Sequence, residues 1–212
     1  NFLFSSTCAV YSDKLRYVHE NSKKNPKGIY GKTKLMCEKL ITKNFKNYKI
    51  RYCILRYFNV VGASPSKKIG QISKNGQLFK NLSLSLLSKK PVFNVYGNNY
   101  KTLDGTCVRD YIHVRDLSHL HIIALNKINL VGKSIILNCG YGKGLSVLQV
   151  IKEFKKYSKK KIKINFMKRR QGDMTEIIAN ISKLKRNLKW KPKFFSLRKM
   201  VKSTVNWEKK LK

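Results

Sequence analysis

The sequence predicts an α/β fold built on a parallel sheet. Residues 1–6, 50–57 and 134–139 are short, largely apolar or β-branched runs typical of strands. Residues 30–47 and 117–127 instead repeat apolar side chains with the period of a helix. Strands that alternate with helices favour parallel pairing, and such sheets bind ligands at the carboxyl ends of their strands.

The remaining elements are predicted by the same periodicity and by turn residues. Further helices are predicted at residues 78–88, 147–157, 182–188 and 197–210, further strands at 92–96 and 161–167, and loops at 13–28, 63–76 and 97–105. Trp190 and Trp207 are expected to anchor the closing helices. Ser146 is expected to cap a helix after the Gly-rich run 140–144, which lacks the Gly-Lys-[Ser/Thr] ending of a phosphate loop.

The charge is strongly positive, with 47 Lys+Arg against 10 Asp+Glu and a formal net charge of +37. Such a balance suits a nucleic-acid-binding protein. The lysines are nevertheless spread over almost every segment, and Lys, Asn and Ile are abundant together, which indicates an A·T-rich genome. We therefore favour a solvated surface over a selected nucleic-acid site. Apolar runs such as residues 135–137 are too short to span a bilayer.

The cysteines and histidines do not predict a metal site. The five cysteines, at positions 8, 37, 53, 107 and 139, form no Cys-x-x-Cys motif and no zinc spacing with histidine. Buried free thiols in a reducing cytoplasm are the expected state. His119 and His121 are two residues apart, so they do not share a helical face.

Tyr30 and Lys34 are candidates for catalysis, because they stand four residues apart in a predicted helix and share one face. A nearby positive charge favours the phenolate form of a tyrosine, which can then act as a general acid and base. Alone, the Tyr-x-x-x-Lys spacing is weak, since the chain holds 11 Tyr and many lysines. A surface tyrosine packed on a lysine stem is the alternative.

Five further motifs give this pair a context. They are residues 4–11 (FSSTCAVY), 55–63 (LRYFNVVGA), 95–100 (VYGNNY), 104–114 (DGTCVRDYIHV) and 169–173 (RRQGD). With residues 30–34 (YGKTK), their order and spacing resemble the UDP-glucose 4-epimerases, which are extended short-chain dehydrogenases/reductases. The resemblance extends from Asn1 to the C-terminal helix. It implies the C-terminal part of a Rossmann-like parallel sheet domain and a smaller α/β substrate-binding domain.

The resemblance also implies a cofactor, NAD, and a UDP-sugar substrate. It implies that Tyr30 takes the proton of the sugar 4-hydroxyl, directly or through Thr7, and that Lys34 holds the nicotinamide ribose. Hydride passes from the sugar to NAD and returns to the opposite face of a 4-keto sugar. The implied cofactor contacts are Ser5, Ser6, Tyr30, Lys34 and Phe58. The implied substrate contacts are Thr7, Asn59, Gln77, Leu78, Asn94, Tyr96, Arg109, Arg170, Asp173 and Ile177.

Residue chemistry alone leaves several of these roles open. The hydroxyls of residues 5–7 could cap a helix or turn, and Tyr96 could be a core aromatic. Arg109 could bind a diphosphate as a bidentate charge-assisted pair, or it could pair with Asp110. The loop at residues 169–173 could hold an ion pair of its own.

Two positions bear on the reaction and the sugar. Related dehydratases carry Asp-Glu after the threonine that corresponds to Thr7, whereas Cys8-Ala9 supplies no acid to eliminate water, which favours an epimerase. Ile177 corresponds to a position that lines the sugar pocket, and it is neither the bulky Tyr nor the small Cys or Ser of the two sugar preferences. An epimerase for N-acetylated or pentose sugars stays open, as does an inactive basic remnant that binds nucleic acid.

The resemblance also predicts how the chain is divided. Residues 1–62 are expected to belong to the NAD-binding domain with residues 109–130 packed back on it, and residues 63–212 mainly to the nucleotide-sugar domain. The family opens with a Gly-rich turn that holds the NAD pyrophosphate, and no Gly-x-x-Gly-x-x-Gly occurs here. We therefore interpret the chain as the C-terminal two-thirds of an epimerase, expected to be inactive alone. By analogy, a homodimer face would include residues 35–41.

Overall fold

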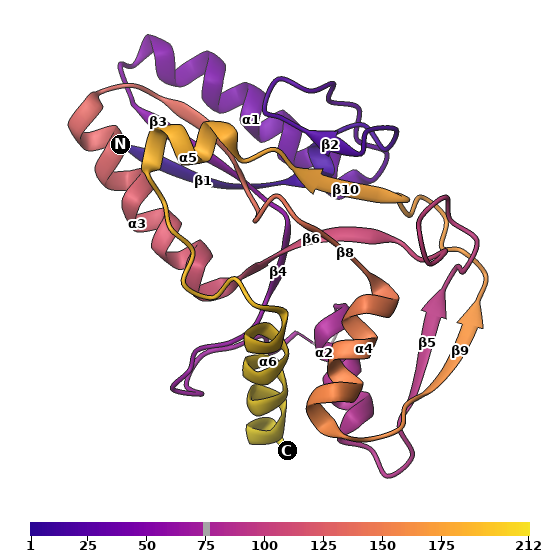
Figure 1. Ribbon diagram of the computed structural model, residues 1–212. Helices are drawn as coiled ribbons and strands as arrows, with labels where there is room; N and C mark the ends of the chain where they lie inside the picture. Colours follow the sequence, from indigo (N-terminus) through magenta and orange to yellow (C-terminus); the bar gives the residue numbers. More distant parts are fainter. Residues whose placement is uncertain (74–76) are drawn as a thin grey trace.

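The computed structural model describes residues 1–73 and 77–212. Its elements are β1 (Phe2–Thr7), the 3₁₀ turn η1 (Cys8–Val10), β2 (Tyr17–Val18), α1 (Ile29–Asn47), β3 (Tyr52–Tyr57), β4 (Asn59–Val61), α2 (Leu78–Leu86), β5 (Val92–Tyr96), β6 (Val108–His113), α3 (Val114–Val131), β7 (Ile135–Cys139), β8 (Gly144–Ser146), α4 (Val147–Ser158), β9 (Lys163–Met167), β10 (Glu176–Ala179), α5 (Ser182–Leu188) and α6 (Leu197–Leu211) (Figure 1). The predicted α/β class is confirmed.

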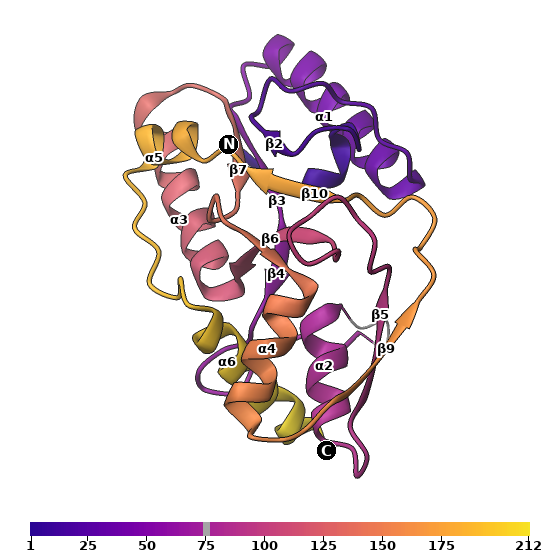
Figure 2. The same cartoon turned by 45° about the vertical axis from the view of Figure 1, so that its right-hand side comes forward.

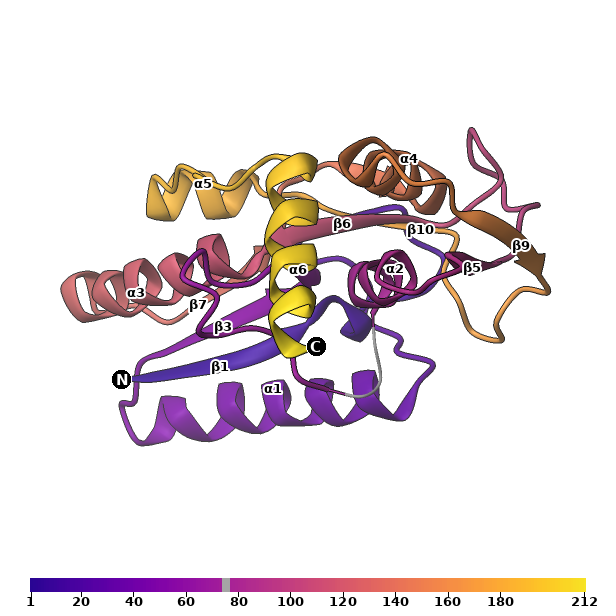
Figure 3. The same cartoon turned by 90° about the horizontal axis from the view of Figure 1, so that it is seen from below.

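The first sheet has the order β1-β3-β7, and all its pairs are parallel. Helix α1 covers one face of this sheet, and α3 covers the other (Figure 3). The alternation of side chains along a strand therefore sends successive residues of β1 and β3 toward different helices. Strand β7 and helix α3 come late in the chain but complete the layer begun by β1 and β3.

The other strands form a second sheet of order β2-β10-β6-β4, with β8 antiparallel to β6, and a parallel pair β5-β9. Helices α2, α4 and α6 pack on one another below this sheet (Figure 2). The main hydrophobic core runs through both regions, and Trp190 and Trp207 are buried as expected of packing anchors. Among the described residues, no helix is both long and apolar enough to cross a membrane.

Most predicted elements are present within a few residues of their expected bounds, but the strands β2, β4, β6, β8 and β10 were not predicted. β2 and β4 are only two and three residues long, and β6 carries Arg109, Asp110 and His113. Neither a short run nor a polar one gives a hydrophobic period that can be read from sequence. The predicted loop at 63–76 ends in residues 74–76, which lie outside the described residues.

Local chemistry explains the elements that were predicted well. Ser146 caps α4 as expected, and it forms a capping box in which its hydroxyl accepts from Gln149 N at 3.1 Å. All five cysteines are free, but only Cys53, Cys107 and Cys139 are buried. Cys8 and Cys37 are partly exposed, so the expectation of five buried thiols is wrong for these two.

Candidate functional site

The first turn of α1 is seated against the turn that follows β1. Gly31 makes this possible, because a Cβ there would overlap the carbonyl oxygen of Ala9 and lie 2.8 Å from the Cβ of Pro26. Tyr30 and Lys32 flank this contact on either side. The glycine inside the Tyr-Gly-Lys-Thr-Lys motif therefore fixes where the helix, and with it Tyr30, meets the sheet.

Tyr30 and Lys34 lie together at the carboxyl end of β1. The Nζ atom of Lys34 donates to the backbone oxygen of Ser5 at 3.0 Å and lies 5.9 Å from the centroid of the Tyr30 ring. The Tyr30 side chain is 60% exposed. The pair thus faces outward at the edge where parallel sheets bind their ligands.

Thr7 closes β1 beside this pair. It is buried, it lies opposite Tyr57 in the β1-β3 register, and its Oγ1 accepts from Ala9 N at 3.2 Å. The capping alternative that residue chemistry left open is therefore present at Thr7. A hydroxyl can accept a second hydrogen bond and also donate one, so the cap leaves its proton available.

Ser5 and Ser6 point to opposite faces of the sheet, as successive strand residues must. The hydroxyl of Ser5 lies 2.5 Å from the hydroxyl of Tyr57, which also contacts His121 on α3. The hydroxyl of Ser6 is buried and donates to Glu38 on α1 at 2.5 Å. Burial raises the pKa of Tyr57 to about 12, so Tyr57 stays a neutral phenol.

Two of the residues predicted to contact the cofactor are therefore turned away from the exposed edge. Ser6 is 1% exposed and faces α1, and Phe58 is 3% exposed in a small apolar cluster with Val10 and Tyr11. Of the set predicted for the cofactor, the structure brings together Ser5, Tyr30 and Lys34. Ser6 faces α1 and its neighbour Ser5 faces the other side of the sheet, because successive side chains alternate along a strand.

A second part of the site is a cavity of about 240 Å³ between β4, β5, β6, α2 and the loop at residues 169–173. Its lining includes eight of the residues predicted to contact the substrate: Asn59, Gln77, Leu78, Asn94, Tyr96, Arg109, Arg170 and Asp173. They come from five separate stretches of the chain. Such convergence of distant polar side chains on one hollow is typical of a ligand site.

The charges of this cavity are arranged around one ion pair. Arg109 Nη2 lies 2.5 Å from Asp173 Oδ1, and both side chains are partly accessible. The guanidinium carbon of Arg170 lies 3.9 Å from the centroid of the Tyr96 ring, which is the geometry of a cation–π pair. Two guanidinium groups beside an aromatic ring can bind a phosphate and a flat base.

The structure decides between the partners that the sequence left open for Arg109. Asp110 is fully buried and accepts hydrogen bonds from the backbone N–H groups of Tyr141, Gly142 and Ala179, and burial raises its pKa to about 6. It is therefore not the partner of Arg109. Asp173 takes that place instead.

The loop at residues 169–173 holds no ion pair of its own among the described contacts, because Asp173 reaches Arg109 on β6. The guanidinium of Arg169 instead donates to the side-chain oxygen of Asn99 at 2.7 Å. The loop is thus attached to two different parts of the chain, and Arg170 between these attachments faces the cavity.

Ile177 does not line the cavity. It is fully buried opposite Arg109 in the β10-β6 register and packs in the same apolar cluster as Phe58. Its contact with the sugar stays a prediction, since the side chain is buried among apolar neighbours rather than at an open surface.

Sequence reasoning missed six residues of the cavity lining: Asn81, Phe93, Val95, Cys107, Tyr111 and Val147. A strand assignment at β6 would have identified two of them. Cys107, Arg109 and Tyr111 alternate along the chain and so share one face of that strand. The others are apolar or helical, and nothing in their local sequence distinguishes them from core residues.

A larger cavity, of about 740 Å³, lies between the β4 loop, α3 and α6. Gln77 is the one predicted site residue in its lining. Most of its surface is apolar, with Phe79, Phe194 and Trp207 prominent. We assign the function to the smaller cavity, because the arginines and the carboxylate that can hold a charged ligand converge there. Among the described residues, no group of His, Cys, Asp and Glu could hold a metal ion.

Known proteins resemble this chain in sequence and in fold. The chain is 37% identical over 99% of its length to UDP-glucose 4-epimerase of Azospirillum brasilense, and it spans 61% of that relative. It is 36% identical over 98% of its length to UDP-arabinose 4-epimerase 1 of Arabidopsis thaliana and spans 51% of that relative. The solved structure of UDP-glucose-4-epimerase from Stenotrophomonas maltophila, with bound NAD and formylated UDP-arabinopyranose, superposes with a TM-score of 0.91 at 33% identity. It is matched over 99% of this chain and 63% of that one.

The family assignment rests on the first two-thirds of the chain, which hold β1, the Tyr30–Lys34 pair and β6. The family model described as "NAD dependent epimerase/dehydratase family" matches residues 1–140. The chain therefore belongs to the NAD dependent epimerase/dehydratase family.

Proposed function

We propose that this chain carries the acid–base pair and the nucleotide-sugar site of an epimerase that interconverts UDP-glucose and UDP-galactose. One observation carries the proposal. Eight residues expected to contact a UDP-sugar line one small cavity, although they come from distant parts of the chain. A coincidental likeness of isolated motifs would not bring those side chains together.

The residues at the β1 edge fit the nicotinamide end of NAD. An ammonium and a phenol lie side by side at the carboxyl end of a parallel strand, with Lys34 held by the backbone of Ser5. Dinucleotides bind at this edge in open α/β sheets. Lys34 would hold the ribose and Ser5 would border the nicotinamide. When bound, NAD accepts the hydrogen of the sugar C4 carbon as hydride and gives it back.

Tyr30 handles the proton in this proposal. Its phenolate takes the proton of the sugar 4-hydroxyl, so that the C4 oxygen becomes a carbonyl as the hydride leaves. The same phenol returns the proton when the hydride is restored to the opposite face of the sugar. Lys34 is held beside the tyrosine by its bond to the Ser5 backbone, and Thr7 can pass the proton between sugar and tyrosine through its hydroxyl.

The cavity residues hold UDP while the sugar turns. Arg109 and Arg170 supply charge-assisted hydrogen bonds to the diphosphate, and Asp173 can accept from ribose hydroxyls. The ring of Tyr96 offers a stacking surface to uracil. Asn59, in β4, follows directly from the β3 strand end that lies beside Thr7. It therefore connects the anchoring cavity with the reacting edge.

A UDP-pentose or UDP-N-acetylhexosamine is the second candidate substrate. One solved structure that resembles this chain contains a formylated UDP-arabinopyranose, and one relative is a UDP-arabinose 4-epimerase. The aliphatic Ile177 does not distinguish these sugars, because it is buried in an apolar cluster with Phe58 and does not line the cavity. The UDP anchors would be the same for all these sugars.

A homodimer and a cytoplasmic location complete the proposal. The outer face of α1 leaves Met36 64% and Leu40 59% exposed, which is unusual for apolar side chains and suits a face that a second copy covers. The five free thiols suit a reducing compartment. We expect no nucleic-acid partner, because the positive charge is spread along the chain, although it would attract a doubly negative nucleotide sugar.

The test is turnover by the natural protein with four substrates in parallel: UDP-galactose, UDP-glucose, UDP-N-acetylgalactosamine and UDP-arabinose. We expect the first two to interconvert with the highest kcat/KM. Faster turnover of one of the other two would move the assignment to that sugar. Binding of RNA in a salt-sensitive manner, with no turnover and no bound NAD, would support the nucleic-acid alternative.

A further inference from the structure

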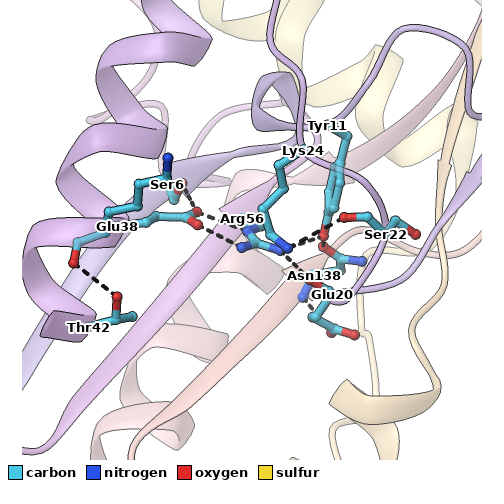
Figure 4. A network of polar contacts seen from close by, with 10 residues as sticks. Ser6, Tyr11, Glu20, Ser22, Lys24, Glu38, Thr42, Arg56 and Asn138 are labelled. Carbon is cyan, nitrogen blue, oxygen red and sulfur yellow. Dashed lines mark hydrogen bonds and ion pairs between the residues drawn. The ribbon is translucent and has the colours of Figure 1, made fainter.

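A buried polar network lies beneath the reacting edge and involves none of the ligand-facing atoms described above. Its centre is the carboxylate of Glu38, on α1, which accepts from Ser6 Oγ at 2.5 Å and from Arg56 Nε and Nη2 at 2.9 and 2.6 Å (Figure 4). Glu38 and Arg56 are 3% and 1% exposed. Neither residue lines the two cavities described above.

Every nitrogen of Arg56 is committed within this network. Besides its two bonds to Glu38, its Nη1 donates to the hydroxyl of Tyr11 at 2.9 Å and to the backbone oxygen of Glu20 at 2.8 Å. The hydroxyl of Tyr11 in turn donates to Asn138 on β7 at 2.6 Å. Directly or through Glu38 and Tyr11, the guanidinium on β3 is therefore connected to α1, to β1 and β7, and to the loop between η1 and α1.

The position of Glu38 on α1 gives the network its meaning. Glu38 follows Lys34 by one helical turn, and Lys34 follows Tyr30 by one turn. Lys34 bonds the backbone of Ser5, and Glu38 bonds the side chain of Ser6, so consecutive helical turns are attached to consecutive residues of β1. Thr7 is the next residue of that strand.

The same carboxylate also connects α1 to β3. Ser6 and Arg56 are partners in the β1-β3 register, so Glu38 bridges two side chains that lie opposite each other on neighbouring strands. Beyond them, β1 continues to Thr7, and β3 continues to Tyr57 and on to Asn59. One buried group thus fixes α1 against the two strand ends that carry the reacting and anchoring residues.

We infer that Glu38, with Ser6 and Arg56, is a positioning residue of the proposed epimerase: it sets the distance of Tyr30 and Lys34 from Thr7 and the substrate. The expected effect on rate rests on the proposed function, whereas the attachment of α1 to β1 and β3 rests on the contacts of Glu38 given above. Small errors in the position of a catalytic group have large kinetic effects, and a misplacement of 1 Å can cost about 10²-fold in rate. It also gives Ser6 a role other than cofactor contact.

A general contribution to stability is the rival explanation, and it predicts different kinetics. If the network only stabilises the fold, disturbing it lowers Tm but leaves kcat per folded molecule unchanged. If it positions Tyr30, kcat falls while KM for the UDP-sugar holds, because UDP is anchored from β6, β5 and the loop at residues 169–173. Glu38→Gln leaves Arg56 without its counter-charge and endangers folding, so a milder variant is needed.

Ser6→Ala is that variant, because it removes one hydrogen bond and keeps the ion pair between Glu38 and Arg56. Ser83→Ala is its matched control: Ser83 is also buried, and its hydroxyl also bonds within the protein, to Phe79 O at 2.9 Å. Both are made in the natural protein. The measurements are Tm, kcat and KM with UDP-galactose, and hydrogen exchange of the amides of residues 29–38.

We expect Ser6→Ala to lower kcat at least about fivefold at constant KM and to speed exchange in residues 29–38, with neither change in Ser83→Ala. Folded Glu38→Gln should lower kcat further. An unchanged kcat in an active protein, or equal effects of the two serine variants, would overturn the inference. If the natural protein turns over no UDP-sugar, the proposed function fails, and the exchange rates alone decide whether Ser6 and Glu38 hold this turn of α1.

Discussion

Two regions of the molecule are built in opposite ways: the edge at the carboxyl end of β1, with Tyr30 and Lys34, and the cavity of about 240 Å³ that we propose binds the nucleotide. At the edge, Tyr30, Lys34 and Glu38 succeed one another on a single helix, and the last two bond to the consecutive β1 residues Ser5 and Ser6. In the cavity, Arg109 on β6 pairs with Asp173, 64 residues away, and Tyr96 on β5 stacks with Arg170 from the same loop as Asp173. One region is organised by a local motif, and the other is organised by the tertiary fold.

This difference separates geometry that tolerates little change from geometry that can adapt. The edge is supported by a buried ion pair and three strands, so a change there should alter rate more than binding. The cavity is lined by side chains from several strands, a helix and a loop, and its charged ones are partly exposed, so a change there should alter binding more than rate. The following predictions use that contrast, from the largest effect to the smallest.

Loss of the phenol at the edge should have the largest effect. We expect Tyr30→Phe to lower kcat of the natural protein about 10³-fold, since positioned acid–base catalysis contributes in this range, with UDP affinity unchanged. Tyr48→Phe, an exposed tyrosine at the other end of the same helix, is the control and should turn over normally. Loss of UDP binding in Tyr30→Phe would show that the two regions are not separable.

Loss of a guanidinium in the cavity should have the next largest effect, and on binding. Arg109→Ala removes a proposed diphosphate contact and leaves Asp173 without its partner, so we expect UDP affinity to fall about 100-fold. Titration calorimetry with UDP measures this directly. Arg198→Ala, which removes an exposed arginine on α6, should bind UDP as the parent does. Equal losses in the two variants would mean that the overall charge, rather than the cavity, attracts the nucleotide.

Two buried groups near the start of α3 should give opposite dependences of stability on pH. Burial raises the pKa of Asp110 to about 6, so its folded form retains a proton that the unfolded form loses, and its contribution falls as pH rises from 4 to 6. Burial lowers the pKa of His113 to about 4, so its contribution is lost as pH falls from 6.5 to 4.

Each of these two effects amounts to about 2 kcal/mol between pH 4.5 and 6.5. Urea unfolding of the two variants at both pH values separates them. Relative to the parent, Asp110→Asn should gain stability from pH 4.5 to 6.5, and His113→Gln should lose it. The same slope in both variants would contradict the assignment of these protonation states.

Loss of an aromatic ring from the cavity should have the smallest effect. Tyr96→Leu removes the cation–π contact with Arg170, which at a partly exposed site is worth about 0.5–1 kcal/mol, so UDP affinity should fall about threefold. Tyr17→Leu removes a similar pair, with Arg16 at 5.2 Å from the ring centroid, in another part of the molecule. It should leave UDP affinity unchanged.

The same contrast explains what could be predicted from the sequence. Helix α1, the strands β1 and β3 and the cap at Ser146 follow from local periodicity and turn chemistry. The partner of Arg109 did not, because the neighbouring Asp110 is taken up by backbone N–H groups that only the fold brings to it. The face of the sheet toward which Ser6 points depends on the alignment of β1 with β3, which only the fold shows. Strand β10 has four residues, which is too short for its pattern to be recognised in the sequence.

The most direct test of the central claim follows the hydrogen at C4 of the sugar. UDP-galactose labelled with deuterium at C4 is converted by the natural protein in ordinary water, and the UDP-glucose product is examined by mass spectrometry and NMR. If the hydrogen leaves as hydride, is held and returns while Tyr30 handles only the hydroxyl proton, the deuterium stays at C4. Exchange of that deuterium for solvent hydrogen, or no conversion at all, would contradict the account.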